Sequence, residues 1–241
     1  MPAAVANSGG MSLGAILLFV GAMLISLLAS WRVKRVYRHW SGVPASSGVT
    51  GAEVAAAILD RAGIRDVEIV AHDAMLGDHY DPLNKRLVLS QDNFHGRSVA
   101  ALGVAAHECG HAIQHATAYA PLHLRMSAVG ITTFASSIAY MPLILAGIGL
   151  LHPYVAMWIT AAAMGVIMLF NLVTLPVEFD ASARAKLVLA DMGFIGRPEE
   201  MAGVRQTLDA AGWTYVAAFV TSLAYFLWHL LPLLTGGRRN D

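Results

Sequence analysis

Long apolar stretches dominate the pattern of hydrophobic and polar positions along this chain. Residues 11–31 contain no charged side chain, and the fifty residues 127–176 contain no Asp, Glu, Lys or Arg. A helix needs about 20 mainly apolar residues to cross a membrane, so the longer stretch suits two spans. Gly149 and Pro153 mark a turn between them, because proline suits the first turn of a helix. With a further apolar stretch later in the chain, the pattern predicts four transmembrane helices over residues 10–31, 127–150, 153–176 and 214–234.

The segments between these spans, residues 32–126 and 177–213, are polar enough to lie outside the bilayer. Their apolar periodicity and turn residues predict a helix from Gly51 to Gly63, strands at 67–71 and 86–90, and a long helix from a Ser98 cap to Thr117. Further helices are expected to begin near Val177 and near Pro198. The predicted fold class is therefore a mainly α membrane protein, in which four transmembrane helices join a small α+β domain with a short antiparallel sheet.

Composition supports a membrane protein and excludes two other classes. Apolar residues make up 56% of the 241 residues and charged residues 13%, whereas soluble domains carry about 25% charged residues. Such a composition excludes intrinsic disorder. Basic and acidic residues number 16 each, which argues against a nucleic-acid partner. A single cysteine, Cys109, excludes an internal disulfide framework.

The distribution of basic residues predicts the orientation in the membrane. Segment 32–126 holds ten Lys and Arg residues and segment 177–213 holds four, whereas residues 1–31 and the turn near residue 152 hold none. Basic residues favour the cytoplasmic side, so both polar segments are expected there, in a multi-pass membrane protein. A secretory signal peptide is the rival interpretation of residues 11–31. A signal peptide carries its positive charge before the apolar core, and here Arg32 follows it.

One motif on the predicted helix 98–117 carries chemistry. His107, Glu108 and His111 form the pattern H-E-x-x-H, which is typical of zinc proteases. Residues four apart share one face of a helix, so both imidazoles can reach one Zn²⁺ ion. Glu108 lies one residue round, where it can take a proton from an activated water.

A catalytic zinc usually has a third protein ligand, and four residues are candidates. His115 lies one turn beyond His111, and His123 is expected in a loop after a proline. Glu178 and Asp180 follow the third predicted span, and carboxylates two residues apart point to different sides of a helix. Asp180 has Arg184 four residues later and suits a salt bridge. Glu178 is therefore favoured as the ligand, with Asp180 as the alternative.

Several stretches in order resemble a known family. They are Asp78–Pro82, Leu87–Ser90, His95–Ala101, Ala106–Gln114 and Leu175–Ser182. Together they resemble the bacterial YugP-like neutral zinc metallopeptidases over residues 10–235. The resemblance implies a membrane-anchored, zincin-like peptidase of a bacterial inner membrane that binds Zn²⁺ through His107, His111 and Glu178, with Glu108 as catalytic acid and base.

The segment Glu178–Phe179 is also similar to the third-ligand segment of CAAX prenyl proteases and heat-shock membrane proteases. Those proteins place an Asp four residues after the ligand Glu. Here that position is Ser182, and the nearby acid is Asp180.

Weaker expectations concern the transition state and the substrate. His79, Tyr80 or Arg184 are candidate donors to an oxyanion, although each is more often a structural turn or salt-bridge residue. The strand 86–90 is expected to hold an extended peptide by main-chain pairing. The expected partners are a peptide or membrane-protein substrate and the lipid bilayer.

Two other functions remain open from the sequence. The first is an intramembrane metalloprotease, which is disfavoured because helix 98–117 carries polar residues that are costly in lipid. The second is a non-enzymatic scaffold or metal-binding transporter module. No Asp, Glu, Lys or Arg lies inside the four predicted spans, where a transport path would need such residues.

Overall fold

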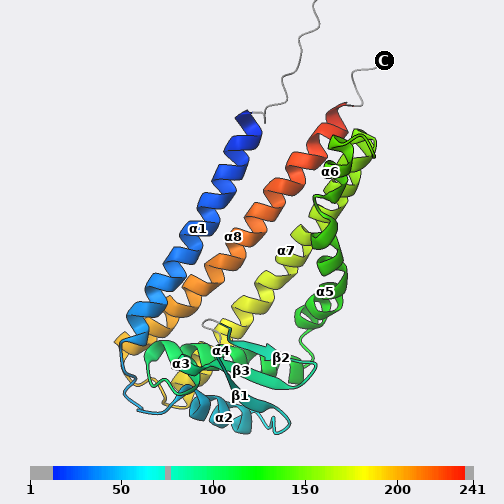
Figure 1. Cartoon of the computed structure of the whole chain (residues 1–241). Coiled ribbons are helices and arrows are strands. Elements are labelled where there is room, and N and C mark those ends of the chain that lie inside the picture. Colours follow the sequence, from blue (N-terminus) through cyan, green and yellow to red (C-terminus); the bar gives the residue numbers. More distant parts are fainter. Residues whose placement is uncertain (1–12, 74–76, 237–241) are drawn as a thin grey trace, which may run out of the picture.

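Four long helical segments form most of the molecule (Figure 1). The computed structural model describes residues 13–73 and 77–236. By length and composition, four segments are long and apolar enough to span a membrane. They are α1 (Leu13–Ser41), α5 with α6 (Ala120–Ile138 and Met141–Gly147), α7 (Pro153–Asp191) and α8 (Pro198–Gly236). The first three residues of the expected span 10–31 lie outside the described residues.

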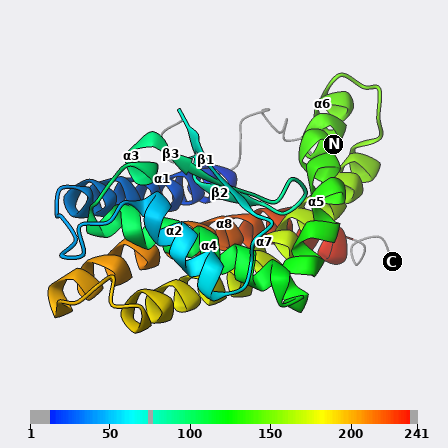
Figure 2. The ribbon, with the colours of Figure 1, turned by 90° about the horizontal axis from the view of Figure 1, so that it is seen from below.

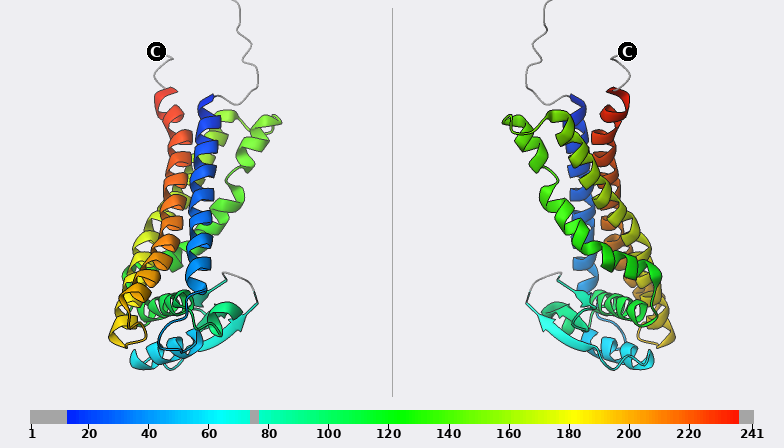
Figure 3. Two further views of the ribbon diagram at one scale, coloured as in Figure 1. Left: turned by 90° about the vertical axis from the view of Figure 1, so that its left-hand side faces the viewer. Right: turned by 90° about the vertical axis from the view of Figure 1, so that its right-hand side faces the viewer.

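A small α+β part lies at one end of these helices. It comprises α2 (Gly51–Arg61), β1 (Glu68–His72), β2 (His79–Asp81), β3 (Arg86–Ser90), α3 (Gln91–Phe94) and α4 (Val99–Ala116). Both side views show it beside the end of α7 and the start of α8, opposite the start of α1 and the end of α8 (Figure 3). The expected helices at 51 and 98 are confirmed. Thr50 and Glu53 form a capping box on α2, and the Ser98 hydroxyl accepts the Ala101 N–H at the start of α4.

The sheet is mixed, so the prediction of an antiparallel sheet was wrong. Its strand order is β1-β3-β2, with β1 parallel to β3 and β2 antiparallel to β3. The sequence pattern missed β2, a three-residue strand. The chain returns along β2 and reverses at a turn where Asp81 accepts the N–H groups of Leu83 and Asn84. This extra reversal gives β3 the same direction as β1.

The helix expected to begin near Val177 does not start there, whereas the helix expected near Pro198 begins at that residue as α8. Helices α7 and α8 each continue without a break through both apolar and polar stretches. A change in side-chain polarity does not interrupt backbone hydrogen bonds, and even Pro176 removes only one of them. His123, expected in a loop, lies in α5, which begins at Ala120. The break within segment 127–150 falls near Tyr140, just before Pro142 in the first turn of α6.

Helix α4 lies at the centre of the small part. It packs against α2 on one side and against α7 and α8 on the other (Figure 2). Its contacts to these helices are made largely by small side chains, and Ala105, Ala106, Cys109 and Ala112 are all buried. Because α7 and α8 continue into the apolar spans, this packing fixes α4 close to the ends of the membrane-length stretches.

Candidate metal centre

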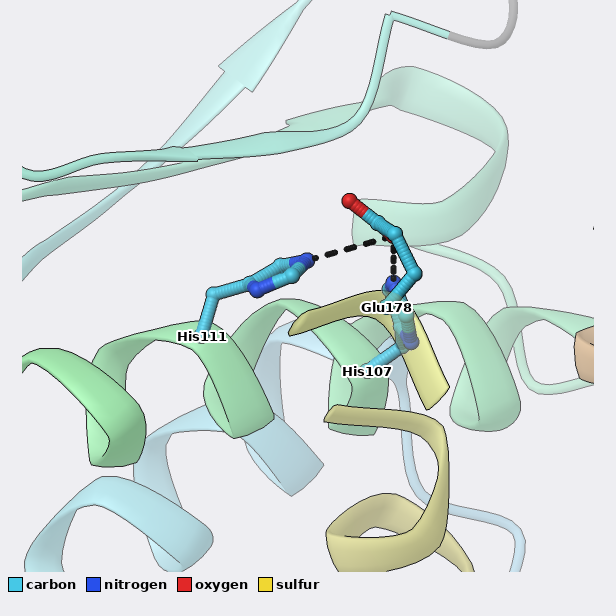
Figure 4. Close-up of side chains that lie close together, drawn as sticks. All are labelled: His107, His111 and Glu178. Atoms are coloured by element: carbon cyan, nitrogen blue, oxygen red, sulfur yellow. Dashed lines mark ion pairs between the residues drawn. The ribbon is translucent and has the colours of Figure 1, made fainter. Parts of the chain in front are cut away.

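Helices α4 and α7 bring three potential metal ligands together. His107, His111 and Glu178 each offer a ligand atom, and these atoms lie within 4.8 Å of one another. The Glu178 Oε2 atom is 3.3 Å from His107 Nε2 and 3.6 Å from His111 Nε2. Figure 4 shows both rings rising from one face of α4 toward the carboxylate from α7. The structure therefore places Glu178, rather than Asp180, beside the two histidines.

A glycine allows this approach of the two helices. A Cβ atom at Gly110 would lie 2.7 Å from the backbone oxygen of Ala181. No side chain fits at that distance from a backbone atom. The glycine of the motif therefore sets the spacing between the helix with the histidines and the helix with Glu178.

Each imidazole also has a partner on its other ring nitrogen. Ser182 Oγ lies 3.1 Å from His107 Nδ1, and Gln114 Oε1 lies 3.0 Å from His111 Nδ1. These contacts turn both Nε2 atoms toward Glu178. CAAX prenyl proteases and heat-shock membrane proteases carry an Asp at the position of Ser182, and here Ser182 contacts the candidate ligand His107.

The environment of Glu178 fits a cation. The residue is only 3% exposed, and its Oε1 atom accepts a hydrogen bond from Arg125 at 3.0 Å. Its Oε2 atom is buried without a hydrogen-bond partner among the described residues. A buried carboxylate oxygen without a donor is costly unless a cation satisfies it. Two imidazole nitrogens and one carboxylate oxygen are a donor set that Zn²⁺ prefers, with room for a water as fourth ligand.

Glu108 lies beside this cluster and is not one of the three ligands. It is buried, and burial raises the pKa of its carboxyl group, although His107 and His111 act in the opposite direction. At His111, burial lowers the pKa, but the Glu178 and Glu108 carboxylates outweigh it and the pKa is raised. Without a metal, the site therefore tends to hold a proton that a cation would replace.

A cavity of about 230 Å³ opens over these residues. One wall comes from β2 and its flanks, and the other from one face of α5, where Leu122, Met126 and Val129 are apolar. The lining residues are Asp78, His79, Tyr80, Pro82, His107, Glu108, His111, Leu122, Arg125, Met126, Val129, Glu178 and Tyr215.

The remaining predicted residues fall into two groups. His79 and Tyr80 line the cavity, where the His79 ring bonds the Gly77 carbonyl and the Tyr80 hydroxyl bonds His115 Nδ1 at 2.9 Å. Burial raises the pKa of Tyr80, which keeps it a proton donor. Asp180 and Arg184 instead form an ion pair at 2.6 Å beside the cluster.

Among the cavity residues that sequence reasoning missed, Arg125 and Tyr215 are the polar ones on the long helices α5 and α8. Arg125 counted only as one basic residue among those that set the orientation, and Tyr215 lies in an apolar stretch. Neither is close to the motif along the chain, so no local pattern pointed to them. They reach the site only because α5 and α8 pack around α7.

The strand expected to hold a peptide was also misidentified. Segment 86–90 is β3, the central strand, and both of its edges are already paired. Of the strands in the described part of the chain, β2 is the edge strand that borders the cavity.

Together, four membrane-length helices and a buried His-His-Glu cluster define a membrane protein with a candidate zinc centre. Comparison with known proteins gives the family. Residues 15–234 match the model of the family described as "Putative neutral zinc metallopeptidase", and the chain belongs to this family, whose description implies Zn²⁺ as the cofactor. It is 41% identical over 225 residues to the "Putative membrane protease YugP" of Bacillus subtilis (strain 168), covering 93% of this chain and 99% of that relative. No solved structure matches the chain.

Proposed function

We propose that this protein is a zinc-dependent endopeptidase that cuts peptide bonds at the cytoplasmic boundary of the membrane. The observation that carries the proposal is the cluster of His107, His111 and Glu178 within 4.8 Å, next to the buried carboxyl of Glu108 in one cavity. The family description and the relative's name support a peptidase.

His107, His111 and Glu178 would hold the metal. When bound, Zn²⁺ supplies a Lewis acid that polarises the scissile carbonyl and lowers the pKa of a water. Glu108 would take a proton from a water in the cavity and pass it to the leaving amine. Its burial suits this role, because a raised pKa makes the ionised carboxylate a stronger base and lets the carboxyl keep the proton until the leaving amine accepts it.

The walls of the cavity suit an extended peptide. Among the described residues β2 pairs only with β3, so its other edge can pair with a peptide main chain. His79 and Tyr80 lie on this wall and are the candidate donors to the developing oxyanion. Arg184 has less claim to that role, because it pairs with Asp180 and is not among the residues that line the cavity.

The position of Glu178 supports cleavage close to the bilayer. Glu178 follows the charge-free stretch 127–176 within the same continuous helix. At 1.5 Å per residue, it lies only about 3 Å along the helix beyond that stretch. The expected substrates are therefore membrane proteins, cut in segments next to their spans, rather than freely soluble peptides.

A matched pair of substrates tests this function. The same unstructured peptide would be presented to the purified protein in liposomes, once fused to a transmembrane anchor and once without it. We expect the anchored peptide to be cut much faster, outside its membrane-spanning segment. Glu108→Gln should abolish cleavage and keep zinc, because this residue is not among the ligands. Full activity in Glu108→Gln would contradict the mechanism, and cleavage within the span would favour an intramembrane protease.

Two exposed leucines test the orientation. Leu83 lies in the turn before β3 and Leu150 in the turn before α7, and they are 86% and 74% exposed. Cys109 is buried and adds little background. In intact cells, a membrane-impermeant thiol reagent should label Leu150→Cys and not Leu83→Cys. The reverse pattern would place the site on the outer side.

A further inference from the structure

Gln114 is a fully buried polar side chain in the middle of the α4 contact with α7. It lies three residues after His111, and its exposed fraction is 0%. Its amide group contacts the backbone and a side chain of α7 as well as a candidate metal ligand. A buried amide costs free energy unless its partners match its donors and acceptor, so these partners determine how the amide is oriented.

Two acceptors fix the amide nitrogen. Nε2 lies 2.8 Å from the Val177 carbonyl oxygen and 2.8 Å from Asp180 Oδ2. Neither atom can donate, because one is a backbone carbonyl and the other belongs to a carboxylate paired with Arg184. If the amide were flipped, its oxygen would face two acceptors. The NH₂ group must therefore point toward α7.

The oxygen of the amide then determines the state of His111. Oε1 lies 3.0 Å from His111 Nδ1. An amide oxygen only accepts, so Nδ1 must carry a hydrogen. In the neutral ring the lone pair is then on Nε2, the atom that faces Glu178 and the candidate metal position.

We propose that Gln114 is a positioning residue that holds His111 in the tautomer able to bind the metal, through a chain of contacts from Arg184 and Asp180. This inference rests on the proposed function only in taking the cluster to be a zinc site. It also accounts for Ser182 at the position where CAAX prenyl proteases and heat-shock membrane proteases place an Asp. Here Ser182 contacts His107 directly, and Asp180 acts on His111 through Gln114.

The competing explanation is that Gln114 only fills space and satisfies the Val177 carbonyl. Gln114→Met keeps the length of the side chain and removes all three polar contacts, to His111, Val177 and Asp180. Ser182→Ala is the matched variant, because it removes the corresponding contact of His107 and leaves Gln114 in place. Zinc affinity is measured by competition with a chelator. The protein loaded with Co²⁺ is then examined by proton NMR, in which the exchangeable Nδ1 hydrogens of coordinated imidazoles give separate shifted signals.

We expect Gln114→Met to weaken zinc binding by about 10–100-fold, as is usual when a partner of a metal ligand is lost. It should also remove the Nδ1–H signal of His111 and keep that of His107. Ser182→Ala should keep the His111 signal. Unchanged zinc affinity in Gln114→Met, with both signals retained, would overturn the inference.

A reversal of the donors provides a second test if Gln114→Met folds poorly. Gln114→Glu sets a carboxylate against Asp180 and should weaken zinc binding. Adding Asp180→Asn supplies an amide donor to Glu at position 114 and should recover at least about half of the loss on a logarithmic scale, as coupled residues do in a double-mutant cycle. No recovery would contradict the chain of contacts.

The outcomes separate this inference from the proposed function. Wild-type protein that binds zinc without cutting any peptide would refute the peptidase function, and the same variants would still decide the role of Gln114. Wild-type protein that binds no metal would overturn both.

Discussion

Replacement of Gly110 by alanine tests how tightly the two ligand-bearing helices must pack. The new Cβ would lie 2.7 Å from the Ala181 oxygen, 3.0 Å from its Cα and 3.1 Å from its carbonyl carbon. All three are backbone atoms of α7 and cannot rotate away. Ordinary contacts begin at 3.4 Å, so the oxygen contact requires the helices to separate locally by about 0.7 Å.

A neighbouring glycine on the same helix is the matched control. At Gly103 a Cβ would lie 3.6 Å or more from its nearest neighbours, all atoms of Val204, which is an ordinary contact. Both substitutions gain about 1 kcal/mol from the better helix propensity of alanine. That gain cancels in the comparison. Overpacking of a core costs about 1–3 kcal/mol, so Gly110→Ala should be less stable than Gly103→Ala by that amount.

Cys109 provides the assay of stability. It is the sole cysteine and is fully buried in α4, so a thiol-specific fluorogenic dye reports its exposure on heating. At about 2–4 °C per kcal/mol, the midpoint for Gly110→Ala should lie at least 2–4 °C below that for Gly103→Ala. Zinc affinity should also fall about tenfold or more, since ligand geometry tolerates only about 0.5 Å. Equal midpoints and equal zinc affinities in the two variants would refute the packing argument.

Three further predictions follow from the ion pairs and hydrogen bonds around the site. Arg125→Gln removes the guanidinium partner of buried Glu178 and should destabilise the metal-free protein by about 1–3 kcal/mol, after allowance for the partial exposure of Arg125. The same thermal assay should show a smaller loss of stability when zinc is bound. An equal loss with and without zinc would contradict the pairing. Glu200→Gln should lower the free energy of unfolding by about 1.5–3 kcal/mol, because the Glu200 carboxylate accepts hydrogen bonds from Ser46, Gly196 and Arg197. These contacts lie away from the metal site, so the zinc content should stay unchanged. A loss of zinc would contradict their separation from the site. Zinc affinity should fall as the pH drops, because the metal needs a neutral imidazole and the raised pKa of His111 lets a proton compete with zinc above the usual value near 6.5. Chelator competition between pH 5.5 and 8 measures this dependence, and a constant affinity would contradict competition between zinc and a proton on His111.

The parts of the molecule that could be predicted from the sequence are those set by local spacing. His107 and His111 share a helix face because they are four residues apart, and α4 begins at the Ser98 cap as expected. The preference for Glu178 over Asp180 came from the i, i+4 relation of Asp180 to Arg184, and the structure has that ion pair.

The other features depend on contacts between distant segments, which local patterns do not encode. The direction of β3 follows from β2, whose three residues are too short to show alternation. Arg125 is 53 residues from Glu178 along the chain, and Gln114 is 66 residues from Asp180. Only the packing of α4 and α5 on α7 brings these pairs together. The continuity of α7 through Pro176 is likewise invisible to a pattern that marks a change in polarity.

X-ray absorption at the zinc edge of the purified, zinc-loaded protein tests the central claim most directly. We expect one zinc ion per chain, with two imidazole nitrogens at about 2.0–2.1 Å and oxygen ligands at about 2.0–2.2 Å. Glu178→Ala should lose most of the zinc, because the metal would keep only two protein ligands. A sulfur ligand at about 2.3 Å, three or more imidazoles, or full zinc occupancy in Glu178→Ala would contradict a centre built from His107, His111 and Glu178.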